Sequence, residues 1–232
     1  MKLIDVQQFW CDGVAVLQHV VPASDVDAIV ALVEPILHEG PKPRPGARRV
    51  LEREPRLRGY IDTGPIRELI TALGGPGARP IRALLFDKRP EANWLVPWHQ
   101  DPTIAVRERI DTPGFVNWNV KDGEVHCQPP LEVLESIFTI RVHLDRCGEE
   151  SGPLRVVRGS HRLGLLGRPQ LDDLVASGRF VEATTDRGGV AVMTPLSVHS
   201  SPKAIDPVHR RRVLHLECTA LELPNGLEWA EA

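Results

Sequence analysis

The sequence has no long hydrophobic run, no strong excess of one charge and no closely spaced pair of cysteines. No apolar stretch approaches the length of a membrane span, and residues 1–5 lack the apolar segment of a secretory signal peptide. The formal net charge is −3 and the pI is about 6.3, which gives no general electrostatic reason to bind nucleic acid or a membrane surface. We therefore expect a cytoplasmic protein with neither kind of partner.

Cysteine is scarce and widely spread: the four residues are Cys11, Cys127, Cys147 and Cys218. Zinc fingers and thioredoxin-like redox motifs need closely spaced cysteines, so this spacing argues against both. Free thiols in a reducing compartment are the expectation.

What is present is an ordinary globular composition, with 42% hydrophobic and 25% charged residues in a chain of 232. That length suffices for one domain with a substantial core. We expect a single domain over residues 1–232, in which a mostly helical part, residues 1–80, packs on a β-rich core at residues 81–222.

The first 80 residues show mainly helical spacing. Helices are expected at residues 6–11, 24–36 and 65–73, and a strand at residues 14–17. In the long helix, Ser24 is the expected N-cap, with Asp27 completing an approximate capping box, and Gly40-Pro41 is the expected stop.

Residues 41–58 are rich in proline, glycine and arginine, which predicts an exposed loop. In the simpler interpretation its arginines pair with Glu52 and Glu54 in solvent. The alternative is that they meet an anionic substrate.

From residue 81 onward, short apolar runs alternate with turn signals, the pattern of an all-β sandwich or jelly roll. Strands are expected at residues 81–87, 95–98, 137–144, 154–157, 190–194 and 211–219, and a short helix at residues 171–177. Residues 114–130 form a long insertion between strands, which is unusual in a compact domain and marks a candidate functional segment.

The motif that is most informative about chemistry is Trp98-His99-Gln100-Asp101, together with His199 much later in the chain. Two imidazoles and one carboxylate are the ligands of the facial triad that holds non-haem Fe(II) with open coordination positions. On a strand, His99 and Asp101 would point to the same face. A bare His-x-Asp also occurs by chance, with Asp101 capping the turn before Pro102. The apolar runs before His99 and His199 favour the metal site.

Four sequence blocks accompany this motif. They are Leu85-Phe86-Asp87-Lys88-Arg89-Pro90 with Trp98-His99-Gln100-Asp101; Thr139-Ile140-Arg141-Val142-His143-Leu144-Asp145; Glu150-Ser151-Gly152-Pro153-Leu154 through Gly159-Ser160-His161; and His199-Ser200-Ser201-Pro202 with Arg211-Arg212-Val213-Leu214. From Phe9 to about residue 220, the chain thereby resembles the phytanoyl-CoA dioxygenase-like family of Fe(II)- and 2-oxoglutarate-dependent oxygenases. The third block is the most specific.

The resemblance implies a mainly β fold with flanking helices: a double-stranded β-helix, that is, a cupin-like jelly roll with the metal at one mouth. The implied Fe(II) ligands are His99, Asp101 and His199, and the implied 2-oxoglutarate contacts are Lys88, Ser201 and Arg211. The interval from His199 to the arginines is one residue longer than usual, so Arg210 and Arg212 remain alternatives for the arginine that binds the distal carboxylate. A guanidinium suits that carboxylate because it forms paired, charge-assisted hydrogen bonds.

The implied activity is that of a dioxygenase that uses Fe(II), 2-oxoglutarate and O2, hydroxylates a small organic molecule, and releases succinate and CO2. Asp101 favours hydroxylation over halogenation, since halogenases of this superfamily have a small residue at that position. One alternative is a β-helix protein that binds a metal or metabolite without turnover. Another is a cupin-like isomerase or hydrolase that uses a different divalent metal.

Candidate substrate contacts are Trp118, His126 and Arg141, with Gln128 and His143 as further candidates on the same segments. Arg141 and His143 have the parity of Thr139, so one face of the expected strand carries all three. The alternative for Arg141 is an ion pair with Asp145 or a neighbouring carboxylate.

Overall fold

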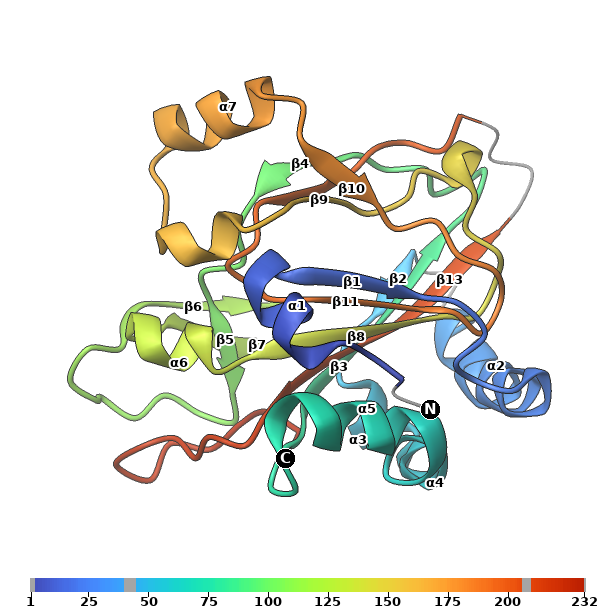
Figure 1. Ribbon diagram of the computed structural model, residues 1–232. Helices are drawn as coiled ribbons and strands as arrows, with labels where there is room; N and C mark the ends of the chain where they lie inside the picture. The colour runs from blue at the N-terminus through green and yellow to red at the C-terminus, as the bar shows by residue number, and fades with distance from the viewer. Residues whose placement is uncertain (1–2, 40–44, 206–209, 232) are drawn as a thin grey trace.

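The computed structural model describes residues 3–39, 45–205 and 210–231, and most of its regular structure is antiparallel β-sheet (Figure 1). The strands are β1 Val14–Leu17, β2 Gly46–Ala47, β3 Arg79–Lys88, β4 Val96–His99, β5 Ile104–Val106, β6 Val116–Lys121, β7 Glu124–Gln128, β8 Phe138–His143, β9 Arg155–Val157, β10 Phe180–Glu182, β11 Val190–Met193, β12 His199–Ser201 and β13 Arg211–Thr219. They form a six-stranded sheet of order β1-β11-β8-β13-β3-β2, a four-stranded sheet of order β10-β9-β12-β4 and a three-stranded sheet of order β5-β7-β6.

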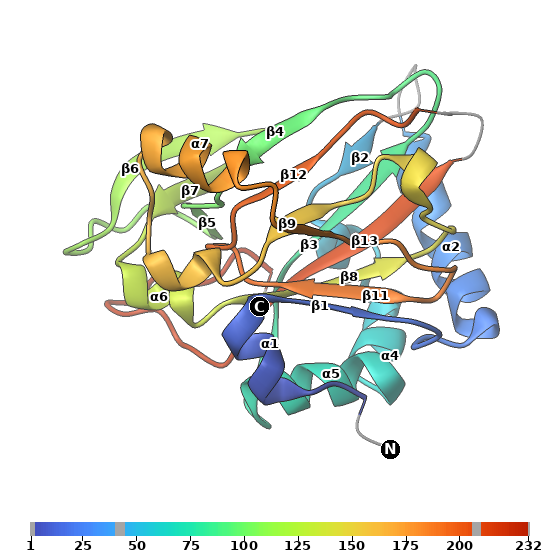
Figure 2. The ribbon, with the colours of Figure 1, turned by 45° about the horizontal axis from the view of Figure 1, so that its top comes forward.

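The six- and four-stranded sheets make the two walls of a double-stranded β-helix (Figure 2). Along the chain, β3, β8, β11 and β13 enter the large sheet, while β4, β9, β10 and β12 enter the small one. Apolar side chains from both sheets meet between them, among them Val156 of β9 and Ala191 of β11. The expected jelly roll is therefore confirmed, and all six expected strands are present within a few residues of their predicted ends.

Alternation along β8 and β13 gives the large sheet one apolar face and one polar face. Ile140 and Val142 of β8 belong to the largest hydrophobic cluster, as do Leu214 and Leu216 of β13. The residues between them point to the opposite face, because successive side chains of a strand alternate. That opposite face forms the inner wall of the β-helix, and it carries the polar residues of the candidate site.

The helices lie mostly on the outer, apolar face of the large sheet (Figure 1). They are α1 Val6–Asp12, α2 Ala23–Leu37, α3 Val50–Arg53, α4 Arg58–Ile61, α5 Gly64–Gly74, α6 Leu131–Glu135 and α7 Arg168–Ala176, with 3-10 turns at Pro55–Leu57, Glu149–Ser151 and Ser160–Leu163. Ile29 of α2 and Leu69 of α5 are fully buried in the shared cluster. Across the described part of the chain, no helix is both long and apolar enough to cross a membrane. All four cysteines are free.

Two expectations for the N-terminal part were wrong. The long helix begins at Ala23 with Pro22 as its N-cap, and Ser24 Oγ contacts the Asp25 carboxylate instead of capping the backbone. Within residues 45–58 the expected loop is replaced by β2, α3 and a 3-10 turn, because Val50, Leu51 and Leu57 are apolar enough to be buried against the sheet. The expected stop at Gly40-Pro41 lies outside the described residues.

The expected long insertion is a β-hairpin, formed by β6 and β7. Asp122 and Gly123 make its two-residue turn, with φ of 51° and 80°, the left-handed pair that such a turn requires. Arg48 binds the Asp122 carboxylate and Arg49 donates to the Gly123 carbonyl, which ties the hairpin tip to the segment after β2. The sequence signal for this turn was the Asp-Gly pair.

Candidate functional site

Two imidazoles and one carboxylate converge where β4 and β12 pair. His99 and His199 are direct cross-strand partners, and their ring centroids are 4.2 Å apart. His99 Nε2 lies 3.4 Å from Asp101 Oδ1, and His199 Nε2 lies 3.5 Å from Asp101 Oδ2. One donor atom from each residue lies within 4.8 Å of the others, the only such group of three or more His, Cys, Asp or Glu residues in the described ranges. Asp101 lies two residues beyond the last residue of β4, so it reaches the site from the following turn and not from the strand.

Both histidines are held in the tautomer that a metal requires. His99 Nδ1 lies 2.8 Å from the Pro97 carbonyl and His199 Nδ1 lies 2.8 Å from the Ser197 carbonyl. Each Nδ1–H therefore donates to backbone, and each Nε2 presents its lone pair toward Asp101. This donor set fits a divalent transition metal with open positions.

The protonation states of His199 and Asp101 also suit a metal. Burial lowers the pKa of His199 to about 4, despite the attraction of Asp101, so this imidazole is neutral at pH 7. Desolvation opposes ionisation of Asp101, but the nearby His199 and His99 outweigh it and hold the Asp101 pKa below its usual value. A neutral imidazole and an ionised carboxylate are the forms that coordinate.

Gln100, the residue between the two ligand candidates, fixes the turn. Its side-chain amide donates to the Leu196 and Gly164 carbonyls at 2.6 and 2.8 Å, and its oxygen accepts from Leu166 N–H at 2.9 Å. Asp101 N–H adds a bond of 2.9 Å to the Pro195 carbonyl. These contacts hold the His-x-Asp turn against the chain segment that precedes His199.

A buried cationic group lies deeper in the β-helix. Lys88 and Arg211 are partners across the β3–β13 ladder and are 1% and 3% exposed. Lys88 Nζ donates to Ser201 Oγ at 3.1 Å and to the Pro202 carbonyl at 2.6 Å. Neither cation has a carboxylate partner among the described residues. Burial and the nearby Arg211 lower the pKa of Lys88 to about 7.

Gly152 places this group. Its carbonyl accepts from Arg211 Nη1 and from Ser201 Oγ, both at 3.0 Å. Its φ is +64°, and a Cβ there would lie 2.4 Å from the Pro202 carbonyl oxygen. Only glycine fits this approach without displacement, which explains why the third sequence block needs its Gly-Pro step.

The three adjacent arginines have separate environments. Arg210 binds Asp87 at 2.6 Å and Glu34 at 2.6 Å. Arg212 binds Asp145 at 2.7 Å and also reaches Glu34, at 2.9 Å. Arg210 and Arg212 therefore point outward, toward carboxylates of β3, α2 and the turn after β8. By strand alternation Arg211 points inward.

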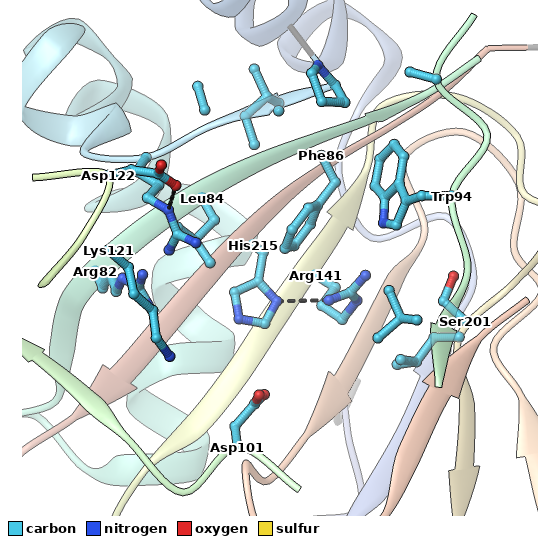
Figure 3. A pocket seen from close by; sticks show the side chains of 18 of the residues that line it. Arg82, Leu84, Phe86, Trp94, Asp101, Lys121, Asp122, Arg141, Ser201 and His215 are labelled. Carbon is cyan, nitrogen blue, oxygen red and sulfur yellow. Dashed lines mark hydrogen bonds and ion pairs between the residues drawn. The ribbon is translucent and has the colours of Figure 1, made fainter. Parts of the chain in front are cut away.

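A cavity of about 1540 Å³ lies between the two sheets, with His99, Asp101, His199, Ser201 and Arg211 in its wall. Figure 3 shows Asp101 and Ser201 among the residues that line it. This volume is well above what a molecule the size of 2-oxoglutarate fills, since pockets for drug-sized ligands occupy roughly 300–1,000 Å³. Room therefore remains for a second small molecule beside the metal position.

The candidate substrate residues separate into two groups. His126 and Arg141 line the cavity. Trp118 does not: it packs on the satellite core of the hairpin and donates to the Phe115 carbonyl. Gln128 binds Asn117 outside the cavity, and His143, although it shares the strand parity of Arg141, is buried and does not line the cavity. For Trp118, His126 and Gln128, the placement was decided by the strand register inside the hairpin, which the sequence pattern did not reveal.

The ion pairs expected for the arginines are partly confirmed. Arg141 does not pair with Asp145, because Asp145 is taken by Arg212 and Arg141 hydrogen-bonds His215. In the arginine-rich segment, Arg56 pairs with Glu54 at 2.6 Å and Arg49 lies 3.8 Å from Glu52, so the expected partners are confirmed for these two arginines. The other described arginines of the segment, Arg48, Arg53 and Arg58, pair with Asp122, Glu39 and Asp62 instead.

Two residues of the cavity wall, His215 and Glu217, were missed by the sequence reasoning. Both lie on β13 and share the parity of Arg211, so they point to the same side of the sheet. That shared parity is the signal from which they could have been found.

Two imidazoles and a carboxylate at the mouth of a double-stranded β-helix, with a buried arginine further in, define the class of Fe(II)- and 2-oxoglutarate-dependent oxygenases. The family comparison agrees with this class. The family model described as Phytanoyl-CoA dioxygenase (PhyH) matches residues 9–211, and the chain belongs to this family. No curated protein sequence matches significantly.

Solved structures show the same fold at low sequence identity. EctD from S. alaskensis, crystallised with 2-oxoglutarate and 5-hydroxyectoine, has a TM-score of 0.70 and 19% identity, over 92% of this chain and 74% of that one. The non-heme alpha ketoglutarate dependent carbocyclase SnoK from nogalamycin biosynthesis has a TM-score of 0.68 and 16% identity, over 92% and 82%. HygX from Streptomyces hygroscopicus, with nickel and 2-oxoglutarate bound, has a TM-score of 0.66 and 15% identity, over 93% and 87%.

Proposed function

We propose that this Fe(II)- and 2-oxoglutarate-dependent dioxygenase hydroxylates a small organic molecule, with iron held by His99, Asp101 and His199. The observation that carries the proposal is the convergence of the two Nε2 atoms and the Asp101 carboxylate within 4.8 Å, at the wall of a cavity large enough for two small molecules. Iron with 2-oxoglutarate supplies the oxidising chemistry: one atom of O2 enters a substrate C–H bond and the other enters succinate as CO2 is released.

For the co-substrate we propose Arg211 as the residue that binds the distal carboxylate. It is the inward member of the three arginines, and no carboxylate in the described ranges neutralises it. A buried unpaired carboxylate or guanidinium costs several kcal/mol, so each removes the penalty of the other. Ser201 lines the same wall and offers a hydroxyl. Lys88 lies behind Ser201 and adds positive charge there.

The remaining tasks of the chain are orientation and charge compensation. The backbone carbonyls of Pro97 and Ser197 hold each imidazole with Nε2 toward the metal position. The Asp101 carboxylate occupies the third ligand position, which supports hydroxylation, since a halide would need that position open.

The test is anaerobic loading with Fe(II), followed by measurement of bound iron and of succinate formed from 2-oxoglutarate and O2. We expect about one iron per chain in the wild type. Replacing a direct ligand should cost more than the ~10–100-fold typical of outer-shell changes, so Asp101→Ala should lose both iron and succinate formation. Asp172→Ala is the matched control, because Asp172 is an exposed carboxylate that pairs with Arg168 on α7.

Three results would contradict the proposal in different ways. Full iron content in Asp101→Ala would remove this residue from the ligand set. Iron binding without any succinate, across a broad panel of small molecules, would favour a protein that binds without turnover. Activity with Zn(II) equal to that with Fe(II) would favour an isomerase or hydrolase.

A further inference from the structure

The inner face of the large sheet carries a row of polar residues beside the proposed co-substrate position. From β13 come Arg211, His215 and Glu217, two or four residues apart. Their cross-strand partners include Lys88 opposite Arg211 and Arg141 opposite His215. The row therefore runs from the cationic end at Arg211, past Arg141 and His215, to Glu217.

Arg141 is a buried cation whose polar side-chain partner, among the residues that the structure describes, is a neutral group. It is 8% exposed, and its Nη1 lies 2.8 Å from His215 Nδ1. Since a guanidinium can only donate, His215 accepts at Nδ1 and carries its own proton on Nε2. The Phe86 ring packs against the guanidinium, with its centroid 5.3 Å from Arg141 Cζ. Arg141 Nε has no hydrogen-bond partner, and no carboxylate in the described part of the chain pairs with the side chain.

The other arginines at the same cavity differ in this respect. Arg82 contacts Glu124 at 2.7 Å and Glu217 at 3.0 Å. Arg48 contacts Asp122 at 3.0 Å and Arg53 pairs with Glu39. Arg211 has the distal carboxylate of 2-oxoglutarate as its proposed partner. Arg141 is left without an anion after the proposed co-substrate is placed.

The charges of the site with Fe(II) and 2-oxoglutarate bound also indicate that Arg141 needs an anionic partner. Fe(II), Arg211 and a protonated Lys88 bring four positive charges to the loaded site, whereas Asp101 and the 2-oxoglutarate dianion bring three negative charges. Arg141 adds a further buried positive charge that has no carboxylate partner among the described residues, and a substrate anion paired with it removes the cost of burying that charge. Burial and the nearby Arg211 lower the pKa of Arg141 only to about 10, so it stays protonated at neutral pH.

We propose that Arg141, with His215 beside it, receives a carboxylate of the substrate, so that the substrate class is small organic acids. This inference rests on the proposed function and names its substrate class. Figure 3 shows Arg141 and His215 side by side in the cavity, with Phe86 next to them and Asp101 facing them. An acid bound there has its apolar part against Leu84, Phe86 and Trp94, which line the same cavity, and its C–H bonds near the metal position.

The test uses the Fe(II)-loaded protein without O2 and with saturating 2-oxoglutarate, so that Arg211 is already occupied. The probes are acetate, hexanoate, benzoate and 3-phenylpropionate, each compared with its carboxamide. The readouts are the charge-transfer absorption band of iron-bound 2-oxoglutarate and the Tm. We expect at least one acid to perturb the band and raise the Tm. It should do so at a concentration about tenfold lower than its carboxamide requires, because the carboxamide lacks the charge-assisted hydrogen bond to Arg141.

Variants of Arg141 test whether this residue, and not another part of the site, causes the preference for acids. Arg141→Gln should remove the preference for acids, while Arg141→Lys, which keeps the charge, should retain part of it. Arg168→Gln is the control, since Arg168 is an exposed arginine on α7 whose partner is Asp172.

Each contrary outcome overturns a defined part of the scheme. Equal effects of acids and amides on the wild type overturn the inference without any variant. Competition between the acids and 2-oxoglutarate would show that the acids bind at Arg211, and this result overturns the inference. A weaker 2-oxoglutarate complex in Arg141→Gln, with acid preference unchanged, assigns Arg141 to the co-substrate instead. Absence of the charge-transfer band in the wild type refutes the proposed function itself.

Discussion

Lys88 and Arg211 face each other directly across the antiparallel β3–β13 ladder, two buried cations on the inner wall of the β-helix. Like charges directly opposite one another destabilise a sheet, and burial adds to the cost. Such a pair is retained where a ligand supplies the missing negative charge. Changes to this pair, and to the glycine that positions it, should therefore alter the binding of 2-oxoglutarate. A change to a buried carboxylate elsewhere in the fold should instead alter the free energy of unfolding.

Arg211→Met should weaken 2-oxoglutarate binding by about 3 kcal/mol, or ~100-fold in Kd, because the distal carboxylate loses its charge-assisted hydrogen bonds. Titration of the Fe(II)-loaded protein with 2-oxoglutarate measures the change. Arg212→Met is the matched control: Arg212 binds Asp145 and Glu34 outside the cavity, so its loss should change Kd less than ~3-fold. The reverse ranking would assign the carboxylate to Arg212.

Binding of 2-oxoglutarate should weaken as the pH rises above about 7, the value to which burial and Arg211 lower the pKa of Lys88. Below this pH, Lys88 is already charged in the free protein. Above it, the dianion must be accompanied by a proton taken up by Lys88, so Kd rises by up to ~10-fold per pH unit. Calorimetry in buffers of different ionisation enthalpy measures the proton uptake. Lys88→Met should abolish it, and undiminished uptake in this variant would assign the proton to another group.

Gly152→Ala should weaken 2-oxoglutarate binding about tenfold or more and also destabilise the fold by ~1–3 kcal/mol. Its Cβ would lie 2.4 Å from the Pro202 carbonyl, and the resulting shift moves the carbonyl that holds both Arg211 and Ser201. Gly178→Ala is the control. Its φ is also positive, at +68°, but nothing lies within 4 Å, so only backbone strain is added. Comparable losses of 2-oxoglutarate affinity in both variants would show that strain alone is responsible.

Glu231→Ala should lower the free energy of unfolding by ~1–3 kcal/mol. The Glu231 carboxylate is 6% exposed and accepts from the backbone N–H groups of Leu51, Glu52 and Ala83, which lose their partner in the variant. Glu228→Ala is the control, since its exposed pair with Arg107 contributes little. Urea denaturation monitored by fluorescence compares the two, and equal stability would refute a structural role for Glu231.

The alternation of β8 and β13 could be read from the amino acids alone, and with it which of their residues face the helices and which face the cavity. A strand has a period of two, and the alternation of apolar and polar residue types in Leu214-His215-Leu216-Glu217 therefore indicates which face of the sheet each side chain is on. The His-x-Asp spacing and the Asp-Gly turn of the β6–β7 hairpin are equally local. Each of these depends on neighbours within a few residues.

Which carboxylates bind Arg210 and Arg212, and which candidate substrate residues line the cavity, followed from the folded chain and not from the local pattern. Arg210 and Arg212 are paired by Asp87, Asp145 and Glu34, which come from β3, the turn after β8 and helix α2. The pairing of β12 with β4 likewise sets His199 opposite His99. These contacts join segments that are far apart in the chain, and a local pattern of residue types records burial but not the identity of a distant partner.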